Sequence, residues 1–375
     1  NLITLYHLIF IVKIKNIMRV CILGDGLSAL TLAKALINQN IFVDIFIKKK
    51  AQNINQTRTL GISKYSSDFI NKNIINIEKI LWKIKRIEIF TDNLKDEKIL
   101  NFKNNDQLFS IIKNYEFYKI LEKNLSKNKY FKKSIISQED LSLVENYEII
   151  INCDYHHKIT KKYFSKKIIK KYNSVAYTTI INHENILNDT AVQIFTKRGP
   201  LAFLPINNNQ TSVVYSIQNP INKNNDNIKE QIHHYNYKYK IKKIEKIEQV
   251  ELKSLDLRSY HHKNILAFGD LLHRLHPLAG QGFNMTIRDI MELTKIIKRR
   301  LELGLPFDQS VCSEFENNIR HKNLIFSNGI NLVHEFFNVE RKMNNSVLSK
   351  SVKFIGNNSL INKIFTKIAD KGISF

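Results

Sequence analysis

The residues best suited to chemistry lie in one stretch, residues 265–289, where an apolar run ends at a glycine followed by an acid. A strand is predicted to end at Gly269, and the carboxylate of Asp270 at its C-terminal edge can accept hydrogen bonds from sugar hydroxyls. The Gly280–Gly282 triplet then opens an amphipathic helix predicted over residues 284–303. The N-terminal amides of that helix can face an anion or an electron-rich ring.

A second glycine-rich turn lies near the start of the chain. An apolar run at residues 20–23, the turn Gly24-Asp25-Gly26-Leu27-Ser28-Ala29, helical spacing from Leu30 to Leu36 and a second apolar run at 42–47 follow one another. This order predicts a strand, a helix and a strand, and the turn reads G-x-G-x-x-A, as the dinucleotide fingerprint allows. Gly24 makes the tight turn, Gly26 lets the backbone approach a pyrophosphate, and the helix supplies unpaired N–H groups.

One part of the fingerprint is missing. The acid that closes the second strand and holds the ribose hydroxyls is replaced by Ile47, and three lysines, Lys48 to Lys50, follow it. Asp44 lies near the nominal spacing but in the middle of the strand, where it cannot reach a ribose. Adenosine binding is therefore expected to depart from the usual pattern.

The composition excludes several classes of protein. The 375 residues are 43% hydrophobic, which predicts a globular protein with a sizeable core. The formal charge of +24 comes from lysines scattered through every segment, so no nucleic-acid-binding face is expected, although attraction to anionic lipid stays open. Three separated cysteines predict neither a disulfide framework nor a metal cluster, which fits a cytoplasmic protein.

No apolar run is long enough to predict a membrane-spanning helix. The apolar residues 2–12 are broken by Tyr6 and His7, and residues 1–17 could be a signal-like stretch. We favour the other interpretation, in which they are a non-native extension and Met18 is the natural start.

Here the residues resemble a known family. Residues 265–289 resemble the second FAD motif of the class A flavoprotein aromatic hydroxylases, and specifically of the ubiquinone-biosynthesis hydroxylases. Further similar segments follow the same chain order: residues 58–63 (Arg-x-x-x-x-Ser), Trp82, residues 190–196 with 199–205, and Phe315-Glu316 with Arg320 and Asn323. The resemblance extends over residues 18–375.

The resemblance implies an α/β fold, in which a Rossmann-like FAD-binding domain carries an inserted, mostly antiparallel β-sheet substrate domain and C-terminal helices. The implied parts are an FAD domain from residues 18–80, 105–170 and 262–325, a substrate sheet from 81–104 and 171–261, and C-terminal helices over 326–375.

The resemblance also implies an activity. FAD would be reduced by NAD(P)H and would react with O2 to a C4a-hydroperoxide, which hydroxylates the aromatic ring of a polyprenyl phenol in ubiquinone biosynthesis. Two alternatives stay open. One is a related flavoprotein acting on another aromatic or isoprenoid substrate, and the other is a non-catalytic homologue that scaffolds quinone-synthesis proteins.

By the same resemblance, the cofactor contacts the two glycine-rich regions and an arginine near the flavin. The residues implied are Gly24, Gly26, Leu27, Ser28, Ala29, Arg58, Gly269, Asp270, Pro277, Gly280, Gln281, Gly282, Phe283 and Asn284. The chain departs from the family at Asp154-Tyr155, where Asp-Gly is usual, and Tyr155 would need a different backbone if that position required positive φ.

The substrate pocket and the catalytic groups are less defined. Phe195, Phe203, Leu204 and Tyr215 could line a pocket for a lipophilic substrate or be sheet core. The polar candidates His183, Tyr215, His273 and His276 are equally suited to structural roles, so no catalytic acid or base is nominated. His273 and His276 lack a third ligand, and no metal site is expected.

A basic amphipathic helix is predicted near the C-terminus, with Ile361, Ile364, Phe365 and Ile368 on one face. It could pack on the FAD domain or attach the protein peripherally to the inner face of a membrane, near a lipophilic aromatic substrate and other quinone-synthesis proteins.

Overall fold

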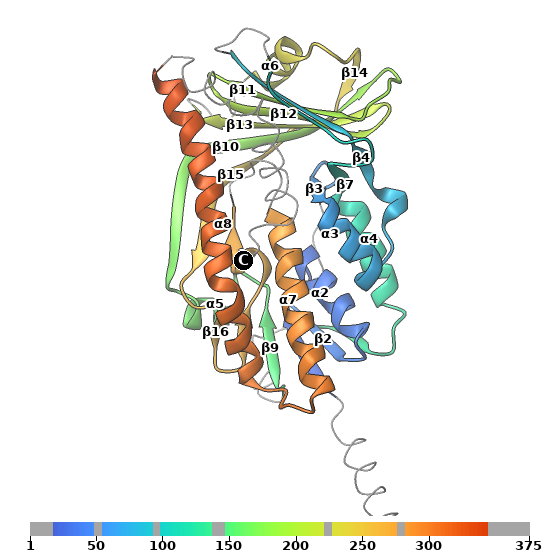
Figure 1. Cartoon of the computed structure of the whole chain (residues 1–375), viewed down its shortest axis with the longest axis vertical. Coiled ribbons are helices and arrows are strands. Elements are labelled where there is room, and N and C mark those ends of the chain that lie inside the picture. Colours follow the sequence, from blue (N-terminus) through green and yellow to red (C-terminus); the bar gives the residue numbers. More distant parts are fainter. Residues whose placement is uncertain are drawn as a thin grey trace, which may run out of the picture.

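The chain folds around three β-sheets with helices packed on them. The computed structural model describes residues 18–48, 55–92, 98–136, 147–220, 227–275 and 282–343. Figure 1 shows the largest sheet lying across one end of the molecule, with a parallel sheet and its helices at the other end. The predicted α/β fold, with a Rossmann-like part and a mostly antiparallel sheet, is confirmed.

The Rossmann-like part is a six-stranded sheet in the order β16-β17-β9-β1-β2-β8. Its strands are β1 (Arg19–Leu23), β2 (Phe42–Ile47), β8 (Phe131–Ile135), β9 (Ile149–Asn152), β16 (His261–His262) and β17 (Ile265–Ala267). All neighbouring pairs are parallel except β16 with β17. The predicted strand, helix and strand at the start are confirmed as β1, α2 (Leu27–Ile37) and β2.

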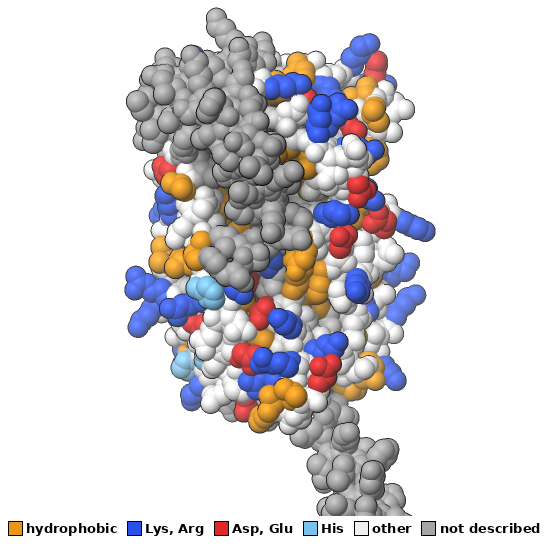
Figure 2. Space-filling view, in the orientation of Figure 1, with side chains coloured by type: hydrophobic (Ala, Val, Ile, Leu, Met, Phe, Trp, Pro, Cys, Tyr) orange, Lys and Arg blue, Asp and Glu red, His pale blue; other side chains and the backbone are white. Residues whose placement is uncertain are grey.

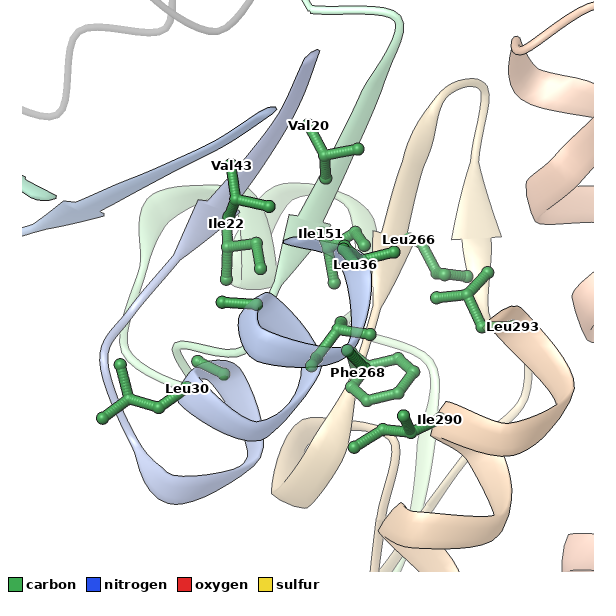
Figure 3. Close-up of a cluster of buried hydrophobic side chains, with 14 of the residues drawn as sticks. Val20, Ile22, Leu30, Leu36, Val43, Ile151, Leu266, Phe268, Ile290 and Leu293 are labelled. Carbon is green, nitrogen blue, oxygen red and sulfur yellow. The ribbon is translucent and has the colours of Figure 1, made fainter. Parts of the chain in front are cut away.

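Helices cover this sheet and form the main core with it. Figure 3 shows Leu30 and Leu36 of α2 beside Val20 and Ile22 of β1, while Phe268, Ile290 and Leu293 lie in the same cluster. These side chains are at most 1% exposed. Strands buried on both faces read as continuous apolar runs, which is why β1 and β2 were recognisable in the sequence.

The second part is a nine-stranded sheet in the order β18-β15-β10-β13-β12-β11-β5-β6, with β14 paired to β10. Its strands are β5 (Arg86–Thr91), β6 (Lys98–Lys103), β10 (Lys167–His183), β11 (Thr190–Thr196), β12 (Gly199–Asn207), β13 (Gln210–Gln218), β14 (Ile241–Ile244), β15 (Glu248–Leu257) and β18 (His273–Arg274). Helix α6 (Ile228–Tyr235) packs on its outer face through Ile228 and Ile232 (Figure 1).

A small three-stranded sheet lies between these two parts. It consists of β3 (Thr59–Ser63), β4 (Trp82–Ile84) and β7 (Phe109–Lys113), accompanied by α3 (Lys64–Phe69) and α4 (Asn114–Leu125). Helix α5 (Lys158–Tyr163) follows β9 and belongs to the core of the parallel sheet through Ile159. The Trp82 indole donates to the Asn188 carbonyl (2.6 Å) and so joins this sheet to the nine-stranded one.

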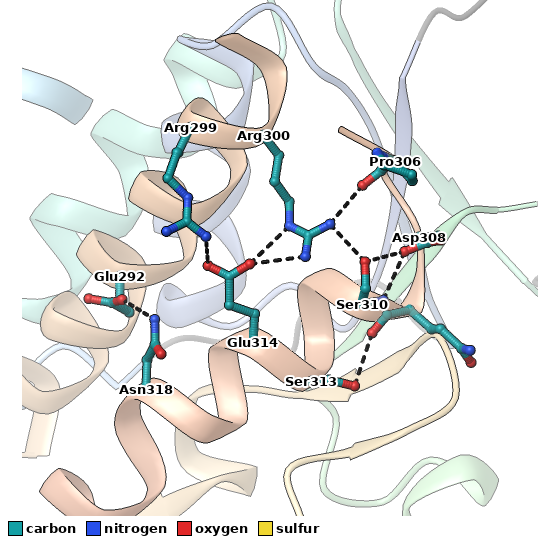
Figure 4. A network of polar contacts seen from close by, with 10 residues as sticks. Glu292, Arg299, Arg300, Pro306, Asp308, Ser310, Ser313, Glu314 and Asn318 are labelled. Carbon is teal, nitrogen blue, oxygen red and sulfur yellow. Dashed lines mark hydrogen bonds and ion pairs between the residues drawn. The ribbon is translucent and has the colours of Figure 1, made fainter. Parts of the chain in front are cut away.

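Two long helices complete the structure, α7 (Gly282–Glu302) and α8 (Gln309–Met343). The helix predicted over 284–303 is thereby confirmed. Figure 4 shows how they are joined: Glu314 accepts hydrogen bonds from Arg299 and Arg300, and Arg300 also donates to Ser310 (2.7 Å). Further along, α8 reaches the nine-stranded sheet, where Ser327 donates to Asp256 (2.9 Å).

The remaining predictions concern the domain boundaries, the two ends of the chain and membrane-spanning helices. The predicted boundaries at residues 170 and 325 fall inside β10, which belongs to the nine-stranded sheet, and inside α8. Residues 1–17 and the amphipathic face around Ile361 lie outside the described residues. Within the described ranges, no helix combines the length and the apolar character needed to cross a bilayer.

Candidate cofactor site

The first glycine-rich turn links β1 to α2 and presents the start of that helix. Gly24 has φ +95°, a conformation that favours glycine, and a Cβ there would only touch Asp154, at 3.4 Å. Gly26 is the N-cap of α2, and a Cβ there would meet nothing within 4 Å. No acid lies in the first turn of α2. The amides of this turn can therefore receive an anion such as a pyrophosphate.

The second glycine segment lies directly against this turn. The Phe268 N–H donates to the Asn152 carbonyl (2.9 Å), which fixes the end of β17 beside β9. Gly269 follows with φ +65°, and a Cβ there would lie 2.8 Å from the Cβ of Ser28 in the first turn of α2. The side chain of Asp270 is exposed at the same edge. The structure thus brings two distant segments of the sequence together.

The start of α7 joins the site to the small sheet. Asn284 is buried, its Oδ1 accepts from the Ser63 N–H (2.9 Å), and its Nδ2 donates to the Gly61 carbonyl (2.9 Å). Phe283 packs edge-on against Phe117. Leu27 and Ala29 belong to α2, Gly282 starts α7, and Arg58 is exposed just before β3. Pro277, Gly280 and Gln281, predicted to contact the cofactor, lie outside the described residues, as does His276.

The missing acid at the end of β2 is not supplied by a neighbour on that strand. Ile47 is 4% exposed and belongs to the core. Asp44 accepts a hydrogen bond from Tyr147 (2.7 Å) and lies 3.6 Å from Arg19, so it is engaged elsewhere. The turn, the helix start and Asp270 fit the phosphates and ribityl chain of a dinucleotide cofactor, whereas β2 offers no carboxylate to its ribose.

Tyr155, at the other departure from the family pattern, is accommodated without left-handed backbone. The described non-glycine residues with positive φ are Asn40, Asn173, Asn219 and Lys263, and Tyr155 is not among them. The Tyr155 hydroxyl accepts a hydrogen bond from Lys167 (2.8 Å), and the Arg274 guanidinium lies 5.8 Å from its ring. The tyrosine therefore replaces the usual glycine without steric conflict.

The four candidate pocket residues do not share one face of the nine-stranded sheet. Phe203 and Tyr215 lie in the cluster beneath α6, and the Tyr215 hydroxyl pairs with Thr196 (3.0 Å). Leu204 packs on the opposite face, in the cluster with Ile84 and Ile111 of the small sheet. Because neighbouring residues in a strand alternate between faces, Phe195 points away from the α6 side, where Ile194 packs.

Sequence reasoning missed several residues on the face toward the small sheet. In register with Leu204, β13 places Ser212, and Ala202 pairs with Val214. Thr59 of β3 donates to Ser212 (2.9 Å), which shows that this face meets the small sheet. Residues next to Phe203 and Tyr215 in their strands must point to the opposite face, and this alternation could have identified Ala202 and Val214 from the sequence.

The polar candidates that lie within the described residues have structural partners. His183 is buried, with its ring nitrogens near the Glu184 carbonyl (2.8 Å) and the Thr211 hydroxyl (3.0 Å), and burial lowers its pKa. His273 Nε2 lies 2.5 Å from Asp289 Oδ2. Burial lowers the pKa of His273, but the nearby carboxylate of Asp289 outweighs burial and the pKa is raised.

The buried pair of His273 and Asp289 belongs to a wider network. Asn323 of α8 donates to Asp289 (3.1 Å), while Glu316 of α8 accepts from the Tyr260 N–H (2.9 Å). Through Asp289, the network joins β18, α7 and α8. Over the described ranges, no three His, Cys, Asp or Glu side chains gather in a way that could hold a metal ion.

Comparisons with known proteins agree with this arrangement. The sequence model of the FAD binding domain family matches residues 159–302. The ubiquinone hydroxylase UbiL of Rhodospirillum rubrum is 25% identical over 165 residues, covering 41% of this chain and 38% of that protein. The 3-demethoxyubiquinol 3-hydroxylase of Escherichia coli is 26% identical over 165 residues, covering 41% of each. The matches thus span about two fifths of these relatives.

Solved structures with the same fold cover nearly the whole chain. HpxO of Klebsiella pneumoniae, complexed with FAD and uric acid, has a TM-score of 0.73 at 10% identity over 94% of this chain and 97% of that one. The p-nitrophenol 4-monooxygenase PnpA of Pseudomonas putida has a TM-score of 0.73 at 11% identity, over 95% and 99%. FAD is the cofactor of the matched domain family and of the HpxO complex. The predicted resemblance is confirmed: the chain has the fold of FAD-dependent monooxygenases and is similar in sequence to ubiquinone hydroxylases.

Proposed function

We propose that this chain is an FAD-dependent monooxygenase that hydroxylates the aromatic ring of a polyprenyl phenol in ubiquinone biosynthesis, using NAD(P)H and O2. The observation that carries the proposal is the meeting of the Gly24 turn, the Gly269-Asp270 segment and the start of α7. The similarity in sequence to two ubiquinone hydroxylases, 25–26% identical over 165 residues, supports the same proposal.

The residues of this chain would bind and orient the cofactor. The first turn of α2 offers its amides to the phosphates, and Asp270 offers a carboxylate to the ribityl hydroxyls. Asn284 fixes the start of α7 against β3, which holds the helix at the flavin end of the site. Bound FAD supplies the redox chemistry that takes electrons from NAD(P)H and transfers one oxygen atom from O2 to the ring.

The substrate would lie on the face of the nine-stranded sheet that looks toward the small sheet. Leu204, Ala202 and Val214 present apolar or small side chains there, which suits a lipophilic ring. Phe195 belongs to this face as well. Phe203 and Tyr215 belong to the core beneath α6 and would support the sheet from behind.

The test has two stages, performed on the full chain. Its visible absorption spectrum, with and without added FAD, is expected to show bound flavin. A polyprenyl phenol should then stimulate NAD(P)H oxidation and give a product heavier by one oxygen atom. If the protein stays colourless after FAD is added, it does not bind flavin, and the non-catalytic scaffold becomes the better interpretation. Bound flavin with turnover only on other aromatics would favour the related flavoprotein.

We also propose that the protein attaches peripherally to a membrane. Such contact would help delivery of the substrate, because a polyprenyl phenol is lipophilic. Ile168 and Ile169 of β10 are 50% and 44% exposed and lie between lysine pairs, and α5 adds three more lysines. Figure 2 shows Lys and Arg side chains beside hydrophobic ones along the margin where Figure 1 places α5 and the first part of β10. Exposed apolar residues flanked by lysines suit an anionic lipid surface.

A further inference from the structure

One row of residues crosses the nine-stranded sheet on the face that looks toward the small sheet. Ala202 of β12 pairs with Val214 of β13, and Val214 pairs with Thr178 of β10. Thr178 pairs in turn with Glu248, the first residue of β15. Because residues directly opposite one another in an antiparallel pair share a face, the side chain of Glu248 lies on the face proposed for the substrate.

The middle of this row is accessible, whereas its neighbours on the same face are covered. Thr178 and Val214 are both partly exposed. Two residues before and after Val214 along β13, Ser212 and Ser216 are only 1% and 5% exposed. An aromatic ring can therefore lie across Thr178 and Val214. Since neighbouring strands are about 4.8 Å apart, a hydroxyl on such a ring would be within reach of the Glu248 carboxylate.

An amide holds one oxygen of this carboxylate in place. Asn55, in the segment before β3, donates a hydrogen bond from Nδ2 to Oε2 of Glu248. The Oδ1 of Asn55 accepts from the Thr57 N–H (2.8 Å) and from the Arg58 N–H (3.0 Å), which fixes the orientation of the amide. Arg58 is the arginine expected near the flavin. The same amide therefore ties Glu248 to the segment expected to meet the cofactor.

The second oxygen of the Glu248 carboxylate, Oε1, has no hydrogen-bond partner among the residues that the structure describes. No Lys, Arg or His within the described ranges forms an ion pair with Glu248 either. A partly exposed carboxylate that no cation neutralises keeps its capacity to accept a hydrogen bond and a proton. This property and its position on the substrate face distinguish Glu248 from a structural ion-pair partner.

We propose that Glu248 is a catalytic residue, which binds the phenol hydroxyl of the substrate and takes its proton while the ring is attacked. The phenol O–H bond breaks, the proton passes to the carboxylate, and the electron pair stays on the phenol oxygen. That pair is delocalised onto the ring carbons ortho and para to the oxygen, which become better nucleophiles toward the oxygen atom that bound FAD supplies. When the hydroxylated carbon loses its hydrogen as a proton and the ring becomes aromatic again, Glu248 returns its proton to the phenol oxygen.

The inference rests on the proposed function and assigns the acid–base group for that reaction. It also predicts the selectivity of the site, because a carboxylate accepts a hydrogen bond from a phenol but not from the corresponding methyl ether. The site should therefore prefer free phenols to aromatic ethers of the same size and apolar character.

The first test measures ligand binding to the FAD-loaded full chain by isothermal titration calorimetry, with 4-butylphenol and its methyl ether as probes. The wild type should bind the phenol about tenfold more tightly, because the ether cannot make the charge-assisted hydrogen bond. In Glu248→Gln this preference should fall to about twofold. The matched control is Glu251→Gln, at an exposed acid of the same strand that is already paired with Lys253 (2.9 Å), and it should keep the wild-type preference.

The second test measures hydroxylation of a polyprenyl phenol. Glu248→Gln should lower kcat about a hundredfold with FAD affinity unchanged, and Glu248→Asp should recover part of the rate. Bound FAD with the same phenol preference in wild type and Glu248→Gln would overturn the inference alone, and a lower Tm in that variant would then identify the carboxylate as a clamp for Asn55. A wild-type chain that binds no FAD would overturn the proposed function and this inference together.

Discussion

The close approach of Gly269 to Ser28 gives the sharpest prediction, since it ties the two glycine-rich segments of the site together. Gly269→Ala places a methyl group 2.8 Å from the Cβ of Ser28, at a residue with φ +65°. The left-handed conformation costs a non-glycine residue about 1–2 kcal/mol, and forced overpacking costs about 1–3 kcal/mol more. We therefore expect a loss of about 2–5 kcal/mol in the free energy of unfolding, together with weaker FAD binding.

Substitutions at other glycines separate the cost of the left-handed conformation from the cost of overpacking. Gly304 has φ +64° but no atom within 4 Å of a Cβ, so Gly304→Ala should show the conformational cost alone. Gly282 has neither a positive φ nor a nearby atom, and Gly282→Ala should be nearly neutral. Adding Ser28→Gly to Gly269→Ala removes the contacted Cβ and should recover about 1–3 kcal/mol, less a smaller helix cost.

The assay is denaturant unfolding followed by circular dichroism, with FAD affinity measured in parallel. If Gly269→Ala and Gly304→Ala lose the same stability, or if Ser28→Gly recovers nothing, the two segments do not press on one another and the geometry of the site is wrong.

Three further predictions concern other parts of the structure. Glu314→Gln should lower the free energy of unfolding by about 1–2 kcal/mol, because Arg300 is 11% exposed and loses a charged acceptor; urea denaturation measures this, and an unchanged midpoint would contradict it. The pKa of His273 is raised in the folded protein, so the stability from its pair with Asp289 is complete below about pH 6.5 and is lost as pH rises through the folded-state pKa. The stability gap between wild type and His273→Gln should accordingly narrow on going from about pH 6 to pH 9, and a constant gap would show that the histidine stays neutral. Exchanging Ile168 and Ile169 for glutamate should weaken sedimentation with anionic vesicles at low salt, whereas Leu187→Glu, at a site 81% exposed on another edge, should not; equal effects would remove the proposed membrane contact.

The sequence alone determined the local elements of the Rossmann-like part. The runs that became β1 and β2 are buried on both faces, so residues 20–23 are continuously apolar and residues 42–47 are apolar except at Asp44. The helix α2 between them repeats its apolar residues at helical spacing. The turn residues Gly24 and Gly26 were recognisable because their conformation and the approach of a ligand depend on a few neighbouring residues. The long helix α7 was recognisable because its apolar residues repeat at helical spacing.

The tertiary structure decided which distant residues meet. No local pattern shows that Gly269 presses on Ser28, that Asn284 bridges Gly61 and Ser63, or that His273 pairs with Asp289. Alternation placed Phe203 and Leu204 on opposite faces of a strand, but which face meets α6 and which meets the small sheet depended on the packing of the whole chain. Spacing and periodicity are local properties of the chain, whereas strand order and layer packing are fixed by burial summed over the whole molecule, so the site emerges only from the complete fold.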